Sequence, residues 1–124
     1  MVINMIKILI VDDSKTSRKM LRGILEDAGM EVVGEASNGQ EALKLFTSLK
    51  PDIVTLDITM PVMDGINALK KIMDVDRTAR VVMVTAAGQK GNVVEALKIG
   101  AKEFVSKPYD VDLIIDVVKK AMDN

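Results

Sequence analysis

Four short apolar runs of this chain each end at polar side chains that can take part in chemistry. Carboxylates bind hard cations or act as nucleophiles, a hydroxyl donates a hydrogen bond, and an ammonium group pairs with anions. If the runs are parallel strands of one sheet, their carboxyl ends meet at one edge and bring these groups together. The runs and the residues that end them are Ile6–Val11 with Asp12 and Asp13, Asp52–Leu56 with Asp57, Val81–Val84 with Thr85, and Glu103–Ser106 with Lys107.

Three carboxylates in one cleft need a positive partner. At ~4 Å separation and an effective dielectric near 20, each pair repels by about 4 kcal/mol. Mg²⁺ suits such a cleft because it takes one or two carboxylates and shares a phosphate oxygen. With Lys107 as a second cation, the cleft is suited to a phosphoryl group, and an Asp carboxylate can accept that group as a nucleophile. We assign this role to Asp57, because the adjacent pair Asp12 and Asp13 suits metal binding.

Each of these residues also has an ordinary structural interpretation. Asp12 and Asp13 could favour the positive end of a helix, by about 0.3–1 kcal/mol per charge. A lone aspartate such as Asp57 is commonly a turn former or a cap. Thr85 could be an ordinary strand residue and Lys107 a solvated charge. The placement of all five at strand ends favours a shared site.

The composition is that of an ordinary globular domain. The 124 residues are 48% hydrophobic and 28% charged, which excludes a disordered chain. The net charge of -1 argues against a nucleic-acid partner. The chain has no Cys and no His, so thiol chemistry and a histidine base are excluded and any metal must be bound by oxygen.

The sequence indicates neither a membrane partner nor export. Its apolar stretches are far shorter than the ~18 residues that a bilayer span requires. The apolar start of the chain runs into Asp12 and Asp13 without a small-residue cleavage site, so a signal peptide is not expected. We therefore expect a cytoplasmic protein.

Strands and helices alternate along the chain. Continuous β-branched runs predict strands buried on both faces, and segments of helical period between them predict helices. Ser14 is a candidate N-cap of the first helix, Gly29 can end that helix in the left-handed conformation, and the second and third helices follow Asn38-Gly39 and Asp64-Gly65. The alternation predicts an α/β fold with a five-stranded parallel sheet, five helices and a single domain over residues 1–124. The predicted strands are Ile6–Val11, Glu31–Ala36, Asp52–Leu56, Arg80–Val84 and Lys102–Ser106.

Side-chain positions are also expected from the helical period. Met20 should lie on the inward stripe of the first helix, and Leu97 should pack with Val93 and Ala96 in the fourth. Phe104 is expected to be a buried strand residue. In the last helix, Leu113 and Ile115 lie beside the core stripe, and this surplus apolar surface could contact a partner.

The residues at the strand ends also match a known family pattern. The chain resembles the receiver domains of two-component response regulators, most closely the stand-alone chemotaxis type (CheY-like), over essentially its whole length. The resemblance implies a flavodoxin-like, doubly wound sheet with strand order 2-1-3-4-5. It rests on the segments Ile8–Asp13, Asp57–Gly65, Thr85–Ala86 and Lys107–Tyr109.

The resemblance implies roles for the acidic residues. Asp57 would receive a phosphoryl group from a phosphohistidine on a sensor histidine kinase, of the chemotaxis type. Asp13 and Asp57 would bind Mg²⁺, with Asp12 acting largely through water and the backbone carbonyl of Thr59 as a further ligand. The protein would then be a switch and not an enzyme, catalysing only its own phosphorylation and dephosphorylation.

The resemblance also implies which residues respond to the phosphoryl group. Thr85 would donate its hydroxyl to it, Lys107 would pair with one of its oxygens, and Phe104 would swing inward as Thr85 moves. This movement would reshape the surface of the fourth helix, fifth strand and fifth helix for a partner such as a flagellar switch component. Thr59 and Ala87 would flank the site and tune the phosphoryl lifetime, and a phosphatase is a possible further partner.

Two residues depart from the family pattern, and several alternatives stay open. Phe104 lacks the hydroxyl of the usual tyrosine, and Tyr109 replaces the usual phenylalanine after Lys107-Pro108, whose bond would be cis. A phosphorelay intermediate or a single-domain regulator outside chemotaxis would use the same site. A haloacid-dehalogenase-like hydrolase needs a second Asp where Ser14 stands, and a flavodoxin-type flavin protein would want stacking aromatics in a chain without Trp.

Overall fold

The computed structural model describes residues 5–86 and 90–123 and contains five strands and five helices in strict alternation. Every predicted strand boundary lies within one residue of the observed one. The strands are β1 (Lys7–Val11), β2 (Glu31–Ala36), β3 (Ile53–Asp57), β4 (Val81–Thr85) and β5 (Glu103–Ser106). The helices are α1 (Lys15–Asp27), α2 (Gly39–Leu49), α3 (Gly65–Val75), α4 (Lys90–Ile99) and α5 (Val111–Asp123).

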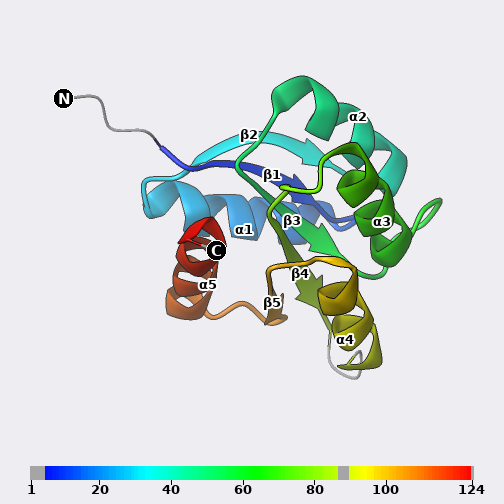
Figure 1. The fold of residues 1–124 in the computed structure, drawn as a ribbon. Helices are drawn as coiled ribbons and strands as arrows, with labels where there is room; N and C mark the ends of the chain where they lie inside the picture. Colours follow the sequence, from blue (N-terminus) through cyan, green and yellow to red (C-terminus); the bar gives the residue numbers. More distant parts are fainter. Residues whose placement is uncertain (1–4, 87–89, 124) are drawn as a thin grey trace.

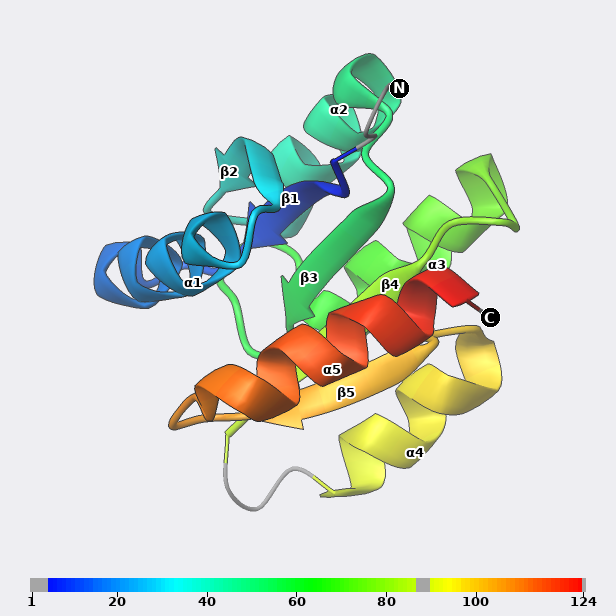
Figure 2. The same cartoon turned by 90° about the vertical axis from the view of Figure 1, so that its left-hand side faces the viewer.

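The strands form one parallel sheet in the order β2-β1-β3-β4-β5. Helices α1 and α5 cover one face, and α2, α3 and α4 cover the other (Figures 1 and 2). The predicted flavodoxin-like fold is therefore confirmed. The strand order reverses between β1 and β3, so the carboxyl ends of these two strands flank the position where open sheets of this kind bind ligands.

Two apolar layers hold the helices on the sheet. Leu21 and Leu25 of α1 pack with Ile114 of α5 against one face, and Phe46 of α2 and Leu69 of α3 pack against the other. Both faces of β3 and β4 are covered, and every residue of these two strands is buried. This explains why both strands appear in the sequence as unbroken runs instead of alternating patterns.

Polar caps start the first three helices. The Ser14 hydroxyl accepts a hydrogen bond of 3.2 Å from the backbone N–H of Ser17, which starts α1 directly after the acidic pair. Asn38 and Asp64 cap α2 and α3 in the same way. Gly29, just beyond α1, has a φ of 84°, the left-handed conformation that glycine favours at the end of a helix.

Some predicted side-chain positions are wrong. Met20 is 55% exposed, because α1 is turned so that Leu21 and Leu25 face the sheet. Phe104 is 47% exposed, because β5 is an edge strand whose buried residue, Val105, faces α5. Leu97 is exposed as well. Of the two residues expected beside the core stripe of α5, Leu113 is exposed, whereas Ile115 is half-buried and packs against the core.

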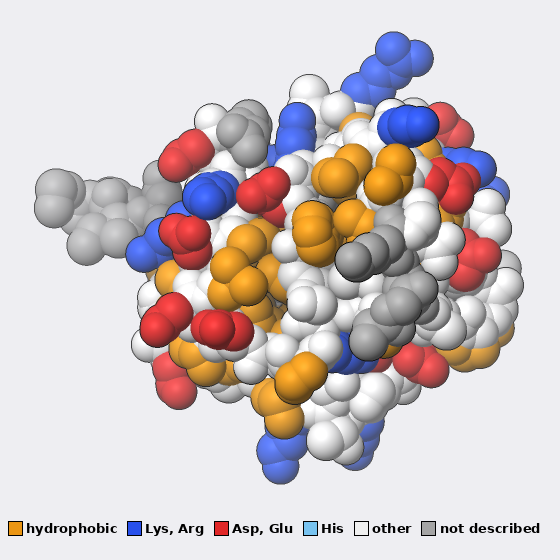
Figure 3. All heavy atoms as spheres, turned by 90° about the horizontal axis from the view of Figure 1, so that it is seen from below, with side chains coloured by type: hydrophobic (Ala, Val, Ile, Leu, Met, Phe, Trp, Pro, Cys, Tyr) orange, Lys and Arg blue, Asp and Glu red, His pale blue; other side chains and the backbone are white. Residues whose placement is uncertain are grey.

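The surface carries charges of both signs. Figure 3 views the molecule from below Figure 1, and hydrophobic side chains emerge there in several groups between acidic and basic ones. In the part of the chain that the structure describes, no helix combines the length and apolar character needed to cross a bilayer.

Candidate functional site at the carboxyl edge of the sheet

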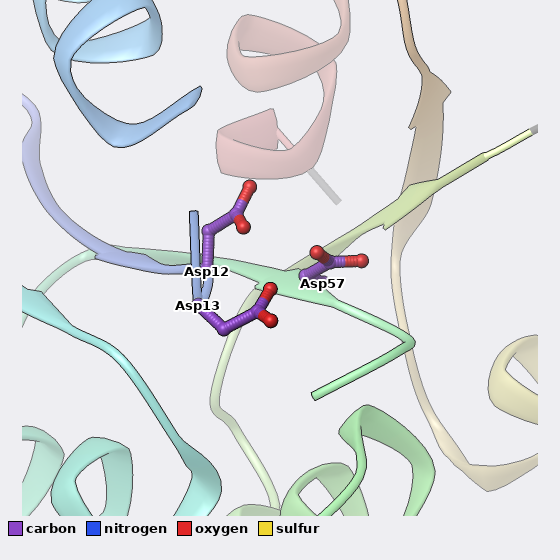
Figure 4. A group of neighbouring side chains, drawn as sticks. All are labelled: Asp12, Asp13 and Asp57. Carbon is purple, nitrogen blue, oxygen red and sulfur yellow. The ribbon is translucent and has the colours of Figure 1, made fainter. Parts of the chain in front are cut away.

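Two neighbouring strands bring three carboxylates together. Asp12 and Asp13 directly follow β1, and Asp57 is the last residue of the adjacent β3. One oxygen from each of the three carboxylates lies within 4.8 Å of the others, and the three side chains share the same edge of the sheet (Figure 4). Asp12 and Asp57 are buried, whereas Asp13 is exposed and gives the cluster its opening to solvent.

Lys107 reaches the cluster from the end of β5. Its Nζ lies 2.8 Å from Oδ2 of Asp12 and 3.4 Å from Oδ2 of Asp57, so one ammonium group bridges both buried acids. The backbone N–H of Lys107 donates to the carbonyl of Thr85, with an N···O distance of 2.9 Å, which anchors the residue beside β4. The Lys107-Pro108 peptide bond is cis, as the family resemblance implies.

The electrostatics of the cluster are dominated by burial and by the proximity of like charges. Burial, followed by the negative charge of Asp12, raises the pKa of Asp57 to about 6, although Lys107 acts in the opposite direction. Burial alone would lower the pKa of Lys107, but the hydrogen bond to Asp12 and the charge of Asp57 together raise it. The bridge by Lys107 therefore offsets only part of the repulsion between the two acids.

The two threonines differ in how far they enter the site. Thr85 ends β4 and is buried, and its hydroxyl donates to the carbonyl of Ala86 with an O···O distance of 2.9 Å. Thr59 is exposed, and its backbone N–H lies 3.3 Å from Oδ1 of Asp57. Ala87 lies outside the described residues.

The loop after Asp57 is tightly folded against the site. The N–H of Gly65 donates to the carbonyl of Ile58, with an N···O distance of 2.7 Å. A Cβ atom on Gly65 would lie 2.1 Å from the carbonyl oxygen of Asp57, closer than any real contact. Residue 65 therefore has to be glycine for α3 to begin where it does.

The structure adds Arg18 to the site, a residue that the sequence analysis missed. Its Nη1 lies 2.6 Å from the backbone carbonyl oxygen of Asp12, and its Nε lies 3.0 Å from Oε1 of Glu35 on β2. The spacing of Arg18, Arg22 and Glu26 in fours predicts a common helix face. Nothing in that spacing indicates that the face meets Glu35, because this contact depends on the packing of α1 beside β2.

A family model describing the response regulator receiver domain matches residues 8–119. The chain belongs to this receiver-domain family. The resemblance inferred from the strand-end residues is thereby confirmed, and with it the class of the protein, a signalling domain of two-component systems and not a metabolic enzyme.

Relatives of this receiver domain include named chemotaxis proteins. It is 52% identical to the chemotaxis protein CheY of Listeria monocytogenes over 117 residues, 94% of this chain and 98% of the relative. It is 48% identical to CheY of Thermotoga maritima over 114 residues, 92% of this chain and 95% of the relative. These matches support the role of a chemotaxis response regulator.

A solved structure supports the same assignment. The receiver domain aligns with a chain of the CheX–CheY–BeF3–Mg complex from Borrelia burgdorferi with a TM-score of 0.87 and 42% identity. The alignment covers 90% of this chain and 85% of the other.

The donor set of the receiver domain fits a hard divalent cation. Burial and the charge of Asp12 raise the pKa of Asp57 even though Lys107 bridges the two buried acids, so a further positive charge beside these carboxylates would be favourable. All side-chain donors in the cluster are carboxylate oxygens, which Mg²⁺ prefers. The acidic cluster is therefore a pocket that could hold Mg²⁺.

Proposed function

We propose that this protein is a response regulator of the chemotaxis type that accepts a phosphoryl group on Asp57 from a phosphohistidine of a sensor histidine kinase. The observation that carries the proposal is the Asp57 carboxylate at the switch point of the sheet, with Lys107 3.4 Å away and two further acids beside it. We further propose that residues 1–124 act as a single receiver domain in the cytoplasm.

In the proposed transfer, a carboxylate oxygen of Asp57 attacks the phosphorus of the phosphohistidine. The new O–P bond forms as the P–N bond breaks, and the released imidazole nitrogen takes up a proton. Lys107 then moves its ammonium group from the carboxylates to a phosphoryl oxygen, and Thr85 donates its hydroxyl to another. These residues act by positioning and by neutralising charge, which is the main protein contribution to phosphoryl transfer.

Mg²⁺ would be held by carboxylate oxygens of Asp13 and Asp57 and by the backbone carbonyl of Thr59, with Asp12 acting largely through water. The metal supplies positive charge that offsets the negative charge of the phosphoryl group. Support comes from the crowded acids, because Lys107 relieves their mutual repulsion only in part.

Thr85 and Phe104 would convert phosphorylation into a conformational change. As Thr85 moves toward the phosphoryl group, Phe104, which is now half exposed on β5, would turn into the space behind it. The exposed apolar side chains of Leu97 and Leu113 lie on the adjacent helices α4 and α5 and would form the surface that changes. A flagellar switch component would bind this surface, and a phosphatase would end the signal.

The direct test is incubation with Mg²⁺ and acetyl phosphate followed by intact mass spectrometry. We expect the wild type to gain the mass of one phosphoryl group and Asp57→Asn to gain none. An equal adduct on Asp57→Asn, or none on the wild type, would contradict the proposal.

Lys107→Ala separates chemical modification from signalling. We expect this variant still to accept the phosphoryl group, because the nucleophile and the metal ligands remain. It should lose the change in affinity for a downstream partner, because no ammonium group couples the phosphoryl group to β5. Partner binding that responds to phosphorylation as in the wild type would rule out this coupling.

A further inference from the structure

A largely buried guanidinium group contacts the turn that carries two of the acids. The Arg18 side chain is 16% exposed, and its Nη1 lies 2.6 Å from the backbone carbonyl oxygen of Asp12. The same guanidinium pairs through Nε with Oε1 of Glu35 at 3.0 Å. Arg18 therefore connects α1 and β2 to the residue at which β1 ends.

Glu35 holds this guanidinium group from the other side. It lies opposite Ile10 in the pairing of β2 with β1, close to the strand end. Its second carboxylate oxygen pairs with Nη1 of Arg22, and Arg22 also pairs with Glu26 at 3.3 Å. Since Glu35 is fixed by two arginines, the orientation of Arg18 is determined by more than its own rotamer preference.

The contact with the Asp12 carbonyl has a consequence for Asp13. The carbonyl oxygen of Asp12 and the nitrogen of Asp13 belong to one planar peptide group, so fixing the oxygen fixes the plane from which Asp13 continues. The N–H of Asp12 is itself bonded to the carbonyl of Ala36, with an N···O distance of 3.0 Å. Because the Asp13 side chain is exposed, packing does not hold its carboxylate, and the backbone sets its direction.

We propose that Arg18 is a positioning residue of the cation site, holding the Asp12–Asp13 peptide so that the Asp13 carboxylate faces Asp57. Arg18 contacts the turn through a backbone carbonyl and raises the affinity for Mg²⁺ although its own charge repels the cation. The inference rests on the proposed function, because it takes Asp13 as a cation ligand.

The test is calorimetric titration of Mg²⁺ alone into the full chain after treatment with EDTA. We expect Arg18→Met to bind Mg²⁺ about tenfold more weakly, the low end of the range for groups that orient metal ligands. A role through charge alone predicts the opposite sign, because removing a guanidinium near the site reduces repulsion of the cation. Arg18→Lys keeps the charge but cannot bridge both acceptors in the same geometry, so it should also bind more weakly.

Arg22→Met is the matched control. Like Arg18→Met, it removes one positive charge from the same face of α1 and one arginine that pairs with Glu35. Unlike Arg18, Arg22 donates no hydrogen bond to the Asp12 carbonyl. We expect its Mg²⁺ affinity to stay close to that of the wild type, because Arg18 keeps its contacts with Glu35 and with the Asp12 carbonyl in this variant. A second measurement is the rise in melting temperature on addition of Mg²⁺, which should be smaller in both Arg18 variants than in the wild type. If Arg18 only stabilised the fold, its replacement would lower the melting temperature equally with and without Mg²⁺.

Each outcome of this experiment is decisive. The inference is overturned if Arg18→Met and Arg18→Lys bind Mg²⁺ as tightly as the wild type. It is also overturned if Arg22→Met loses as much affinity as the two Arg18 variants do. Both results would leave the proposed function intact. A wild type that shows no Mg²⁺ binding would overturn both the inference and the proposed function. If Arg18→Met does not fold, Arg18→Lys alone decides the question.

Discussion

The carboxylate of Asp57 is buried, and its effect on stability depends on pH. Burial and Asp12 raise its pKa in the metal-free fold to about 6, from an ordinary value of 3.8. At a pH between these two pKa values, the Asp57 carboxyl loses its proton in the unfolded chain but keeps it in the folded chain. A pKa that is higher in the folded state means that stability falls as pH rises through this window and reaches its lower plateau above pH 6.

Removing this charge should therefore stabilise the metal-free protein. In EDTA at pH 7, Asp57→Asn should raise the free energy of unfolding by about 1–3 kcal/mol, and this gain should vanish near pH 4. Urea unfolding at a series of pH values measures it. Asp13→Asn, which changes an exposed acid of the same cluster, should give a smaller gain, and equal pH profiles for Asp57→Asn and the wild type would refute this account.

Thr55 is a second buried polar residue, in the centre of β3. Its hydroxyl has no hydrogen-bond partner among the described residues, although the side chain is 2% exposed. Thr55→Val replaces this hydroxyl by a methyl group of similar size and should raise the free energy of unfolding by about 1 kcal/mol. Thr55→Ser keeps the hydroxyl but loses a methyl group, so it should lower the free energy of unfolding instead. Thermal or urea unfolding measures both changes. A less stable Thr55→Val would mean that the hydroxyl has a partner in solution.

At the scale of elements, two glycines in helices should respond in opposite directions to the same substitution. Gly23 lies inside α1, and a Cβ atom there meets nothing within 4 Å. Gly23→Ala should therefore stabilise the fold by about 0.5–1 kcal/mol through helix propensity. Gly65→Ala should destabilise it by more than about 2 kcal/mol, because the new Cβ would strike the backbone that follows β3.

Unfolding of both variants in urea checks this pair. Mg²⁺ binding is a second measurement, because the new Cβ of Gly65→Ala would displace the backbone of Asp57, a proposed metal ligand. Gly65→Ala should therefore bind Mg²⁺ more weakly, whereas Gly23→Ala should bind it as the wild type does. Equal stability of the two variants would show that the β3–α3 loop relaxes around the extra methyl group.

The strand boundaries and the start of α1 were predicted well because their signals are local. Ser14 caps α1 through a hydrogen bond three residues away, and unbroken apolar runs mark strands covered on both faces. The rotation of each helix was predicted less well. Met20 and Leu97 satisfy a helical period, yet both lie outside the packed face, because a period of 3.6 defines a stripe but not which edge of it meets the sheet.

At the scale of the whole molecule, the proposed switch connects the acidic cluster to the far edge of the sheet. Beryllofluoride with Mg²⁺ should mimic the phosphoryl group on Asp57 and slow or redistribute amide hydrogen exchange in α4, β5 and the start of α5. Amides of α2 should be unaffected. Mass-resolved exchange measures the difference, with Asp57→Asn under the same conditions as the control. Identical exchange with and without beryllofluoride in the wild type would show that the domain does not switch as a unit.

By itself, the sequence determined the alternation of strands and helices, the cap of α1 at Ser14 and the five polar residues that end strands. All of these follow from spacing within a few residues and from the rule that parallel strands share their carboxyl edge. The resemblance carried by the same residues determined the family and the strand order.

Only the tertiary structure decided which members of the cluster are buried and what holds them. Asp12 and Asp13 are neighbours in sequence, yet one is buried beside Lys107 and the other faces solvent. Phe104 is exposed because its strand lies at the edge of the sheet, and Arg18 reaches the Asp12 carbonyl because α1 packs beside β2. These properties depend on contacts between segments distant in the chain, which no local pattern contains.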